Sequence, residues 1–191
     1  MIISIIGPSG CGKGTQARRL SGKLGVPHIS TGQLLRDVYE AGTPDGIAAE
    51  KYWGHGEWVS AELMFKILIP RLDKDDCRDG FILDGTPRKM SDIPLFESYL
   101  DGRGDRLDKV FHLDTSEATS LARIQKRVEL TKRRGGEVRD DETPTAIKER
   151  LEEYRETIQP VLDYFEKQGT LERINNERSI GEVFQDIVSH L

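Results

Sequence analysis

Only two cysteines, Cys11 and Cys77, occur among the 191 residues, and they lie far apart in the sequence. Two isolated cysteines form neither the disulfide framework of a small secreted domain nor the paired ligands of a zinc knuckle. The fold must therefore be stabilised by a hydrophobic core, for which 36% hydrophobic residues over this length are sufficient. The length predicts one core domain with a small insertion.

Long apolar runs are also absent. No stretch approaches the length needed to cross a bilayer, and the first residues enter an apolar run without the basic prelude or cleavage site of a signal peptide. The sequence therefore predicts a cytoplasmic protein that does not associate with membranes. The net charge of −5 argues against a nucleic-acid binder, because the affinity of such proteins usually comes from a basic surface.

Positive charge is nevertheless concentrated in one segment. Between positions 123 and 139 the chain carries seven basic and two acidic residues, a local charge of +5 within an acidic protein. A solvated helix face usually mixes the two signs. The segment therefore predicts a focused site for an anion.

A glycine-rich loop near the N-terminus predicts a site for phosphates. The residues GPSGCGKGTQ, at positions 7–16, follow the apolar run Ile2–Ile6 and precede a helical pattern. Glycines allow successive backbone N–H groups to point at an anion, the start of the helix adds its positive end, and Lys13 supplies a mobile cation.

The loop departs from the strict P-loop pattern, which requires Ser or Thr directly after the lysine, because this chain has Gly14 there and Thr15 one position later. Two alternatives to a phosphate loop nevertheless fit less well. A plain turn between a strand and a helix would not, however, need a lysine between two glycines. A dinucleotide fingerprint would need a third glycine at position 15. A nucleoside triphosphate is therefore the expected ligand.

Strand and helix patterns alternate along the chain. Apolar runs at 2–6, 27–30, 80–84, 109–114 and 171–175 predict strands, and apolar residues at helical spacing lie between them. This order predicts an α/β fold with a five-stranded parallel sheet flanked by helices, which binds ligands at the carboxyl ends of its strands. Thr31 is expected to cap a helix, and the helical patterns at 47–52 and 59–72 follow without an intervening strand, which predicts a helical insertion.

The third strand ends in an acidic residue, Asp84. An acid at the end of a buried strand near a phosphate loop can hold Mg²⁺, directly or through water, although a polar residue that simply finishes the strand is the alternative. The sequence offers no catalytic dyad and no metal-binding cluster of histidines. This pattern favours phosphoryl transfer, which relies on positioning, magnesium and arginines rather than on covalent chemistry from the protein.

The motifs resemble those of the adenylate kinases, within the nucleoside monophosphate kinase family, and the resemblance extends over essentially the whole chain. The loop at 7–16 resembles the family's phosphate loop, including the unusual Gly14. The run STGQLLR at 30–36 resembles the start of its monophosphate-binding helix, and GFILDGTPR at 80–88 resembles its third-strand signature. The residues at 139–141, followed by the helical pattern at 147–154, resemble the return from its lid.

This resemblance implies a P-loop kinase of the short-lid type that transfers the γ-phosphoryl group of ATP reversibly to AMP with Mg²⁺. It divides the single domain into a core (1–30, 60–122 and 140–191), an acceptor-binding insertion (31–59) and a lid (123–139). The lid lacks the cysteines of zinc-bearing versions, so no structural zinc is expected. We expect a monomer.

The resemblance also implies roles for individual residues. The implied ATP-binding residues are Gly10, Cys11, Gly12, Lys13, Gly14, Thr15, Arg123, Arg127 and Arg178. The implied AMP-binding residues are Thr31, Arg36, Trp53, Trp58, Val59, Gly85, Arg88, Asp92, Arg139 and Arg150. Those that would act on the transferred phosphoryl group are Lys13, Arg88, Arg123, Arg127, Arg139 and Arg150, and Asp84 would hold magnesium through water.

Three positions depart from the family's pattern. Gln33 stands where the family usually has Asp, Thr86 replaces its usual aromatic, and Asp92 stands where a Gln usually contacts the acceptor base. A carboxylate can only accept hydrogen bonds, which suits guanine better than adenine. A kinase that uses GMP or a broader range of acceptors, and a nucleotide-binding module without activity, are therefore the alternatives to an AMP kinase.

Overall fold

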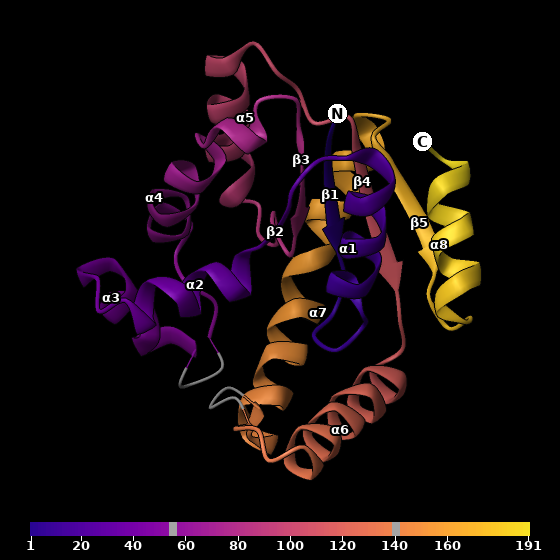
Figure 1. The fold of residues 1–191 in the computed structure, drawn as a ribbon. Coiled ribbons are helices and arrows are strands. Elements are labelled where there is room, and N and C mark those ends of the chain that lie inside the picture. The colour runs from indigo at the N-terminus through magenta and orange to yellow at the C-terminus, as the bar shows by residue number, and fades with distance from the viewer. Residues whose placement is uncertain (54–56, 139–141) are drawn as a thin grey trace.

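The computed structural model describes residues 1–53, 57–138 and 142–191. Its centre is a parallel five-stranded sheet with the strand order β2-β3-β1-β4-β5 (Figure 1). The strands are β1 (Ile2–Ile6), β2 (His28–Ser30), β3 (Phe81–Asp84), β4 (Lys109–Asp114) and β5 (Leu171–Asn175). The predicted fold class is confirmed, and the predicted β2 and β3 each begin one residue too early.

Helices cover both faces of this sheet. They are α1 (Lys13–Leu24), α2 (Thr31–Glu40), α3 (Pro44–Trp53), α4 (Ala61–Leu72), α5 (Asp92–Arg103), α6 (Glu117–Arg133), α7 (Pro144–Lys167) and α8 (Ile180–Ser189), with a 3₁₀ turn, η1, at Asp75–Cys77. Figure 1 shows α2 and α3 projecting away from the sheet and α6 lying beyond its carboxyl edge. Among the described residues, no strand separates α2, α3 and α4, as the helical insertion predicts.

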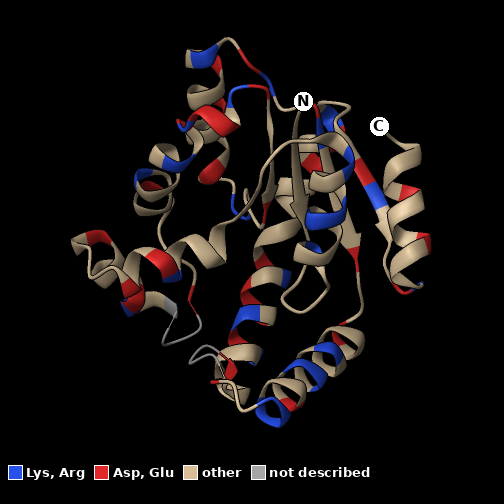
Figure 2. Cartoon of the chain, in the orientation of Figure 1, with Lys and Arg blue, Asp and Glu red and all other residues tan. Residues whose placement is uncertain are grey.

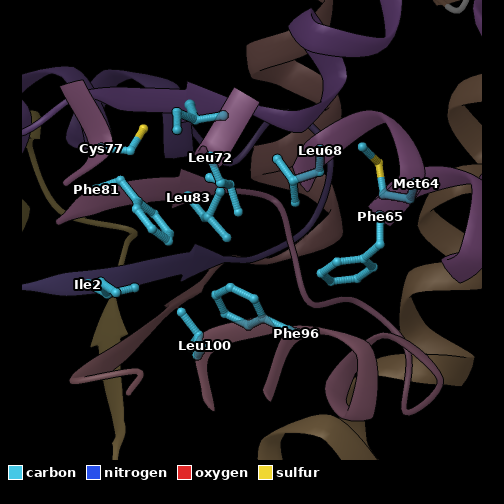
Figure 3. Packing of buried hydrophobic residues seen from close by; sticks show 11 residues of the cluster. Ile2, Met64, Phe65, Leu68, Leu72, Cys77, Phe81, Leu83, Phe96 and Leu100 are labelled. Carbon is cyan, nitrogen blue, oxygen red and sulfur yellow. The ribbon is translucent and has the colours of Figure 1, made fainter. Parts of the chain in front are cut away.

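The core consists of layers on the two faces of the sheet. Ile3 and Ile5 of β1 pack with Leu20 of α1 and Val183 of α8. On the opposite face, the first strand contributes Ile2, which packs with residues of β3, α4 and α5 (Figure 3). All five residues of β1 are buried, as expected for a central parallel strand that is covered on both sides.

The strand register brings three strand ends together at one edge. Ser30 at the end of β2 pairs with Asp84 at the end of β3, and Asp84 pairs with Ile5 near the end of β1. The glycine-rich loop that follows β1 therefore lies next to Asp84, and the start of α2 lies on the other side of β3.

The cap of α2 differs from the prediction. The Ser30 hydroxyl accepts the Gln33 N–H at 3.4 Å, so Ser30 is the cap and Thr31 is the first helical residue. The buried Thr31 hydroxyl instead donates to the Asp84 carbonyl oxygen at 3.1 Å. The prediction that Thr31 caps the helix was wrong. The hydroxyls of Ser30 and Thr31 could both act as the cap, and the end of β3 is close enough to accept a hydrogen bond from Thr31.

Two further helices have boundaries that differ from those predicted. The helix expected at 59–72 begins at Ala61, because the Ser60 hydroxyl accepts the Leu63 N–H at 3.3 Å and caps it. The helix expected at 47–52 extends over Pro44–Trp53. The expected start of the lid at position 123 falls within α6, which is a continuous helix from Glu117 to Arg133.

Candidate functional site

The loop between β1 and α1 depends on its glycines for its shape. Gly10 and Gly12 have φ values of +82° and +99°, in the left-handed region that L side chains rarely adopt. A Cβ added to Gly10 would also lie 2.5 Å from Cγ1 of Ile124 in α6. The loop is therefore closely packed against the helix that carries the basic segment.

Lys13, the first residue of α1, folds back over this loop. Its Nζ donates to the carbonyl oxygens of Gly7 and Pro8, at 2.9 Å each. These contacts place the ammonium at the mouth of the loop, where the N-terminus of α1 adds its own positive end. The arrangement is suited to an anion with several oxygens.

Two side chains hold the loop from outside. The Cys11 carbonyl oxygen accepts a hydrogen bond from Nη1 of Arg123 at 2.7 Å and another from Nδ2 of Asn176 at 2.6 Å. Arg123 also donates to the Asn176 carbonyl oxygen at 2.8 Å, and Asn176 donates to Oγ1 of Thr115. Sequence reasoning missed Asn176, although its place directly after β5 put an amide at the carboxyl edge of the sheet.

The glycine at position 14 is explained by its closeness to Asp84 at the end of β3. A Cβ at this position would lie 3.1 Å from Oδ2 of Asp84, closer than a side chain can sit without displacing the carboxylate. The serine or threonine of the strict P-loop pattern would be crowded here. The deviation at Gly14 therefore makes room for Asp84.

Asp84 is buried at the centre of the site. Its Oδ2 lies 3.4 Å from Nε2 of His28. Burial raises the pKa of the Asp84 carboxyl, but the His28 imidazole and the positive charges of Lys13 and Arg88 outweigh this effect and leave the pKa below its ordinary value. Asp84 is thus an ionised carboxylate near neutral pH, and an oxygen donor of this kind fits a hard divalent cation such as Mg²⁺.

Arg88 lies in the turn that follows β3, close to the end of that strand. Its Nε donates to the Gly85 carbonyl oxygen, and its Nη2 lies 3.5 Å from Oγ1 of Thr31. Gly85 has a φ of +94°, and a Cβ there would overlap the guanidinium. Burial lowers the pKa of Arg88, and the charges of Asp84 and Asp92 oppose that shift.

Asp92 has a task that the sequence did not reveal. Its Oδ2 accepts the backbone N–H of Arg88 at 2.7 Å and that of Lys89 at 3.1 Å. The carboxylate is only 7% exposed and holds the turn that carries the Arg88 side chain. Its expected contact with an acceptor base remains a prediction.

The remaining expected acceptor residues come from separate parts of the chain. Nη2 of Arg36 donates to Oε1 of Gln33 at 2.9 Å, and Nε2 of Gln33 donates to Oδ1 of Asp37 at 2.7 Å. Trp58 contacts the Arg88 guanidinium, with 5.4 Å between Cζ and the ring centroid. Val59 packs on the cluster formed by α4, α5 and β3. Trp53 is the last residue of α3.

The other predicted arginines extend over α6, α7 and the turn before α8. Nη2 of Arg127 pairs with Oε1 of Glu142 at 2.6 Å, and Nε of Arg150 donates to the Ala146 carbonyl oxygen at 3.3 Å. Figure 2 shows the concentration of basic residues on α6. Arg178 pairs with Asp186 and donates to the Asn175 carbonyl oxygen at 3.1 Å, beside Asn176. Arg139 lies outside the described residues.

The described part of the chain contains neither a structural metal cluster nor a membrane-spanning helix. No group of three or more His, Cys, Asp or Glu side chains placed to bind a metal ion occurs in residues 1–53, 57–138 and 142–191. No helix in these ranges is long and apolar enough to cross a membrane. Cys11 and Cys77 are free and buried.

Comparisons with known proteins agree on one family. A family model described as adenylate kinase matches residues 5–170. Proteins named adenylate kinase from Methylobacterium radiotolerans and Methylorubrum populi are each 38% identical to this chain over 191 residues, which cover 100% of this chain and 96% of theirs. One from Brucella ovis is 38% identical over 187 residues, which cover 98% of this chain and 96% of the relative.

Proposed function

The chain belongs to the adenylate kinase family, a family of phosphotransferases, and we propose that it transfers the γ-phosphoryl group of ATP reversibly to AMP at the sheet edge described above. One observation carries this proposal. The Lys13 ammonium of the glycine-rich loop and the Arg88 guanidinium both act electrostatically on the buried Asp84 carboxylate. This shared carboxylate supports a donor site at the loop and an acceptor site at Arg88.

The glycine-rich loop would bind the phosphates of ATP. The residues that we assign to this task are Gly10, Cys11, Gly12, Lys13, Gly14 and Thr15, with Arg123, Arg127 and Arg178 around them. Backbone N–H groups and the N-terminus of α1 would contact the phosphate oxygens. The Lys13 ammonium would give up its hydrogen bonds to the Gly7 and Pro8 carbonyl oxygens and bind the outer phosphates of ATP. The contacts of Arg123 and Asn176 with the Cys11 carbonyl keep the loop in this shape without the ligand.

The acceptor would bind at Arg88, in the turn that follows β3. Arg88 and Arg36 would pair with its phosphate, because a guanidinium can donate two parallel hydrogen bonds to phosphate oxygens. Thr31, Gly85, Trp53, Trp58, Val59 and Asp92 would form the surroundings of the nucleoside. The family assignment favours AMP over GMP or a broader range of acceptors, and it also disfavours a binding module without activity.

Magnesium fits the residues at the centre of the site. Asp84 is an ionised, buried carboxylate next to the loop, and we propose that it holds Mg²⁺ through water. The bound ion would supply positive charge to the phosphate oxygens. Gln33 stands where the resemblance leads us to expect a second acid, and its amide instead contacts Arg36 and Asp37.

The arginines would neutralise the charge that develops during transfer. We assign Lys13, Arg88, Arg123, Arg127, Arg139 and Arg150 to this role, with residues 123–139 as a lid and 31–59 as the acceptor-binding insertion. Closure of both over the nucleotides would exclude water, which strengthens these contacts and protects the phosphoryl group from hydrolysis. The rest of the chain, residues 1–30, 60–122 and 140–191, would act as the rigid core.

We further propose a monomer without structural zinc that acts in the cytoplasm. The two free thiols suit a reducing compartment. ATP and a nucleoside monophosphate would be its partners, without a nucleic acid or a membrane.

A coupled assay tests the function directly. The protein is given ATP and Mg²⁺ with AMP, GMP, CMP, UMP or dTMP in turn, and formation of the diphosphate is measured. The expected result is rapid turnover with AMP and much slower turnover with the other four. Turnover of GMP at the AMP rate would establish a broader acceptor range, and no turnover with any acceptor would contradict the proposal.

A further inference from the structure

Trp58 lies where three separate segments of the chain meet. It lies at the end of the insertion at 31–59, and its indole contacts the turn after β3 that carries Arg88 and Lys89. The same indole meets the ring of Tyr154 in α7, with 6.4 Å between the centroids and 67° between the planes. A single side chain thus joins the insertion to the core beside the arginine expected to bind the acceptor phosphate.

The indole faces two cations at once. Cζ of Arg88 lies 5.4 Å from the ring centroid, and Nζ of Lys89 lies 5.5 Å from it. Both distances are within the range at which the ring attracts a positive charge, and tryptophan is the strongest of the aromatic residues in this respect. Two like charges beside one ring would repel each other unless a nearby acid offsets them.

Glu153 provides that acid and also fixes the position of the indole. Its Oε1 pairs with Nζ of Lys89 at 2.8 Å, and its Oε2 accepts the backbone N–H of Trp58 at 3.0 Å. The carboxylate pairs with the lysine, whereas the Arg88 guanidinium is influenced by the charges of Asp84 and Asp92. Lys89, Glu153 and Trp58 form one connected unit, which we call the indole brace.

The brace has a rigid support behind it. The hydroxyl of Tyr154 lies 2.8 Å from Nε2 of His112, a buried residue in β4, which pairs with the central strand β1. Burial of the indole costs free energy, because Nε1 of Trp58 is buried without a hydrogen-bond partner among the described residues. A phenyl ring would avoid this cost, and the stronger attraction of the indole face for a cation is the gain that offsets it.

We propose that Trp58 is a positioning residue for the transfer reaction, whose indole face holds the Arg88 guanidinium ready for the acceptor phosphate. This inference rests on the proposed function, because Arg88 must receive that phosphate. When the phosphate pairs with Arg88, the net charge facing the ring falls and the cation–π attraction weakens. Trp58 is therefore both a support for Arg88 before binding and a reporter of binding.

The kinetic test compares W58L with W58F. Loss of the aromatic face in W58L should raise KM for AMP about five-fold, with KM for ATP unchanged. W58F should recover most of the loss, because a phenyl ring keeps part of the cation–π attraction. A purely structural role would instead lower Tm and change both KM values together.

Phe184 offers a matched control on the opposite side of the molecule. Its ring also holds an arginine, Arg19, at 4.3 Å from Cζ to the centroid, but it does so between α8 and α1, away from the acceptor side. The variant F184L should keep the wild-type KM for AMP. An equal rise of this KM in F184L and W58L would overturn the inference, because it would show a general effect of losing an aromatic residue.

Fluorescence gives an independent measurement, because the chain contains only two tryptophans. The variant W53F keeps Trp58 as the single indole, and W58F keeps Trp53. AMP should change the emission of W53F with a saturable dependence on concentration. Adenosine, which lacks the phosphate, should produce little of this change, because it leaves the charge of Arg88 unpaired.

The outcomes separate this inference from the proposed function. If the wild-type protein does not phosphorylate AMP from ATP, the proposed function fails. If the wild type is active but W58L has the wild-type KM for AMP, the inference about Trp58 fails. Should W58L not fold, the fluorescence of W53F decides the question, and equal responses to AMP and adenosine would overturn the role of Arg88 in it.

Discussion

The two sides of the site are built in different ways. On the proposed donor side, the glycine-rich loop is held through its own backbone, whose carbonyl oxygens accept hydrogen bonds from the side chains of Lys13, Arg123 and Asn176. On the proposed acceptor side, much of the arrangement consists of contacts between side chains, such as Arg36 with Gln33 and Arg88 with Trp58. The core fixes the donor side, whereas the acceptor side depends on a network of charges.

This difference predicts different responses to substitution. A backbone cradle has one shape, because positive φ angles and close packing at Gly10 leave no alternative. Changes on the donor side should therefore abolish turnover. Contacts between side chains can be weakened one at a time, so changes on the acceptor side should produce graded effects that appear mainly in KM for AMP.

The largest effect is expected at Lys13. The variant K13M removes the only side-chain cation that caps the mouth of the loop among the described contacts, and kcat should fall about 10³-fold. Tm should change little, because the methionine can occupy the same space. The matched control is K23M, which removes an exposed lysine from the last turn of the same helix and should keep full activity. Near wild-type turnover by K13M would contradict the donor-side assignment.

A smaller effect is expected at Arg88. Lysine keeps the charge in R88K but cannot present two parallel donors, so KM for AMP should rise about 10- to 100-fold while KM for ATP stays the same. Steady-state kinetics with each substrate varied in turn give both values. R155K, at an exposed position of α7, is the control. A rise in KM for ATP alone would place Arg88 on the donor side and reverse the comparison.

The third prediction concerns the support beneath the acceptor side. Burial lowers the pKa of His112 from 6.5 to about 4, with Asp114 opposing the shift. The unfolded chain therefore binds more protons than the folded protein between these two values, so stability should fall as the pH is lowered through this window. The loss between pH 7.5 and pH 5 should be about 2 kcal/mol.

Urea unfolding at the two pH values measures this loss. H112Q should lack most of it, because glutamine does not titrate, whereas H190Q, which replaces an exposed histidine near the C-terminus, should keep it. If H112Q loses as much stability as the wild type between pH 7.5 and pH 5, His112 is not the group responsible.

The donor side was the more predictable of the two from the sequence. Strand β1 and the loop are continuous in the chain, so an apolar run followed by glycines and Lys13 contains most of the local information. Asn176 escaped prediction because its partner, the Cys11 carbonyl, is 165 positions away. Only the strand order β1-β4-β5 brings the two together.

The acceptor side was less predictable because its partners come from three elements. The contacts of Trp58 with Lys89 and Glu153 join positions up to 95 residues apart, and no pattern of spacing links them. The predicted cap of α2 was wrong for a related reason, since contact of Thr31 with the end of β3 leaves Ser30 as the cap. The roles of the individual residues remain predictions on both sides.

The smallest effect is expected at Asp92, where two explanations of one residue compete. The sequence predicts that a carboxylate here disfavours adenine, so that D92Q should improve the use of AMP. In the structure, however, one oxygen of Asp92 accepts the backbone N–H of both Arg88 and Lys89. A glutamine is one methylene longer and cannot keep its oxygen in the same place without moving the turn.

We therefore expect kcat/KM for AMP to fall about three- to ten-fold in D92Q, because a charge-assisted contact worth about 1–2 kcal/mol is lost and Arg88 is held less firmly. D92N keeps an acceptor at the original distance and should lose less, and D101N, at an exposed position of the same helix, should lose nothing. Rates with AMP and GMP are measured side by side. An increase for AMP in D92Q would establish the contact with the base, whereas equal decreases for both acceptors would show that Asp92 acts through the turn that positions Arg88.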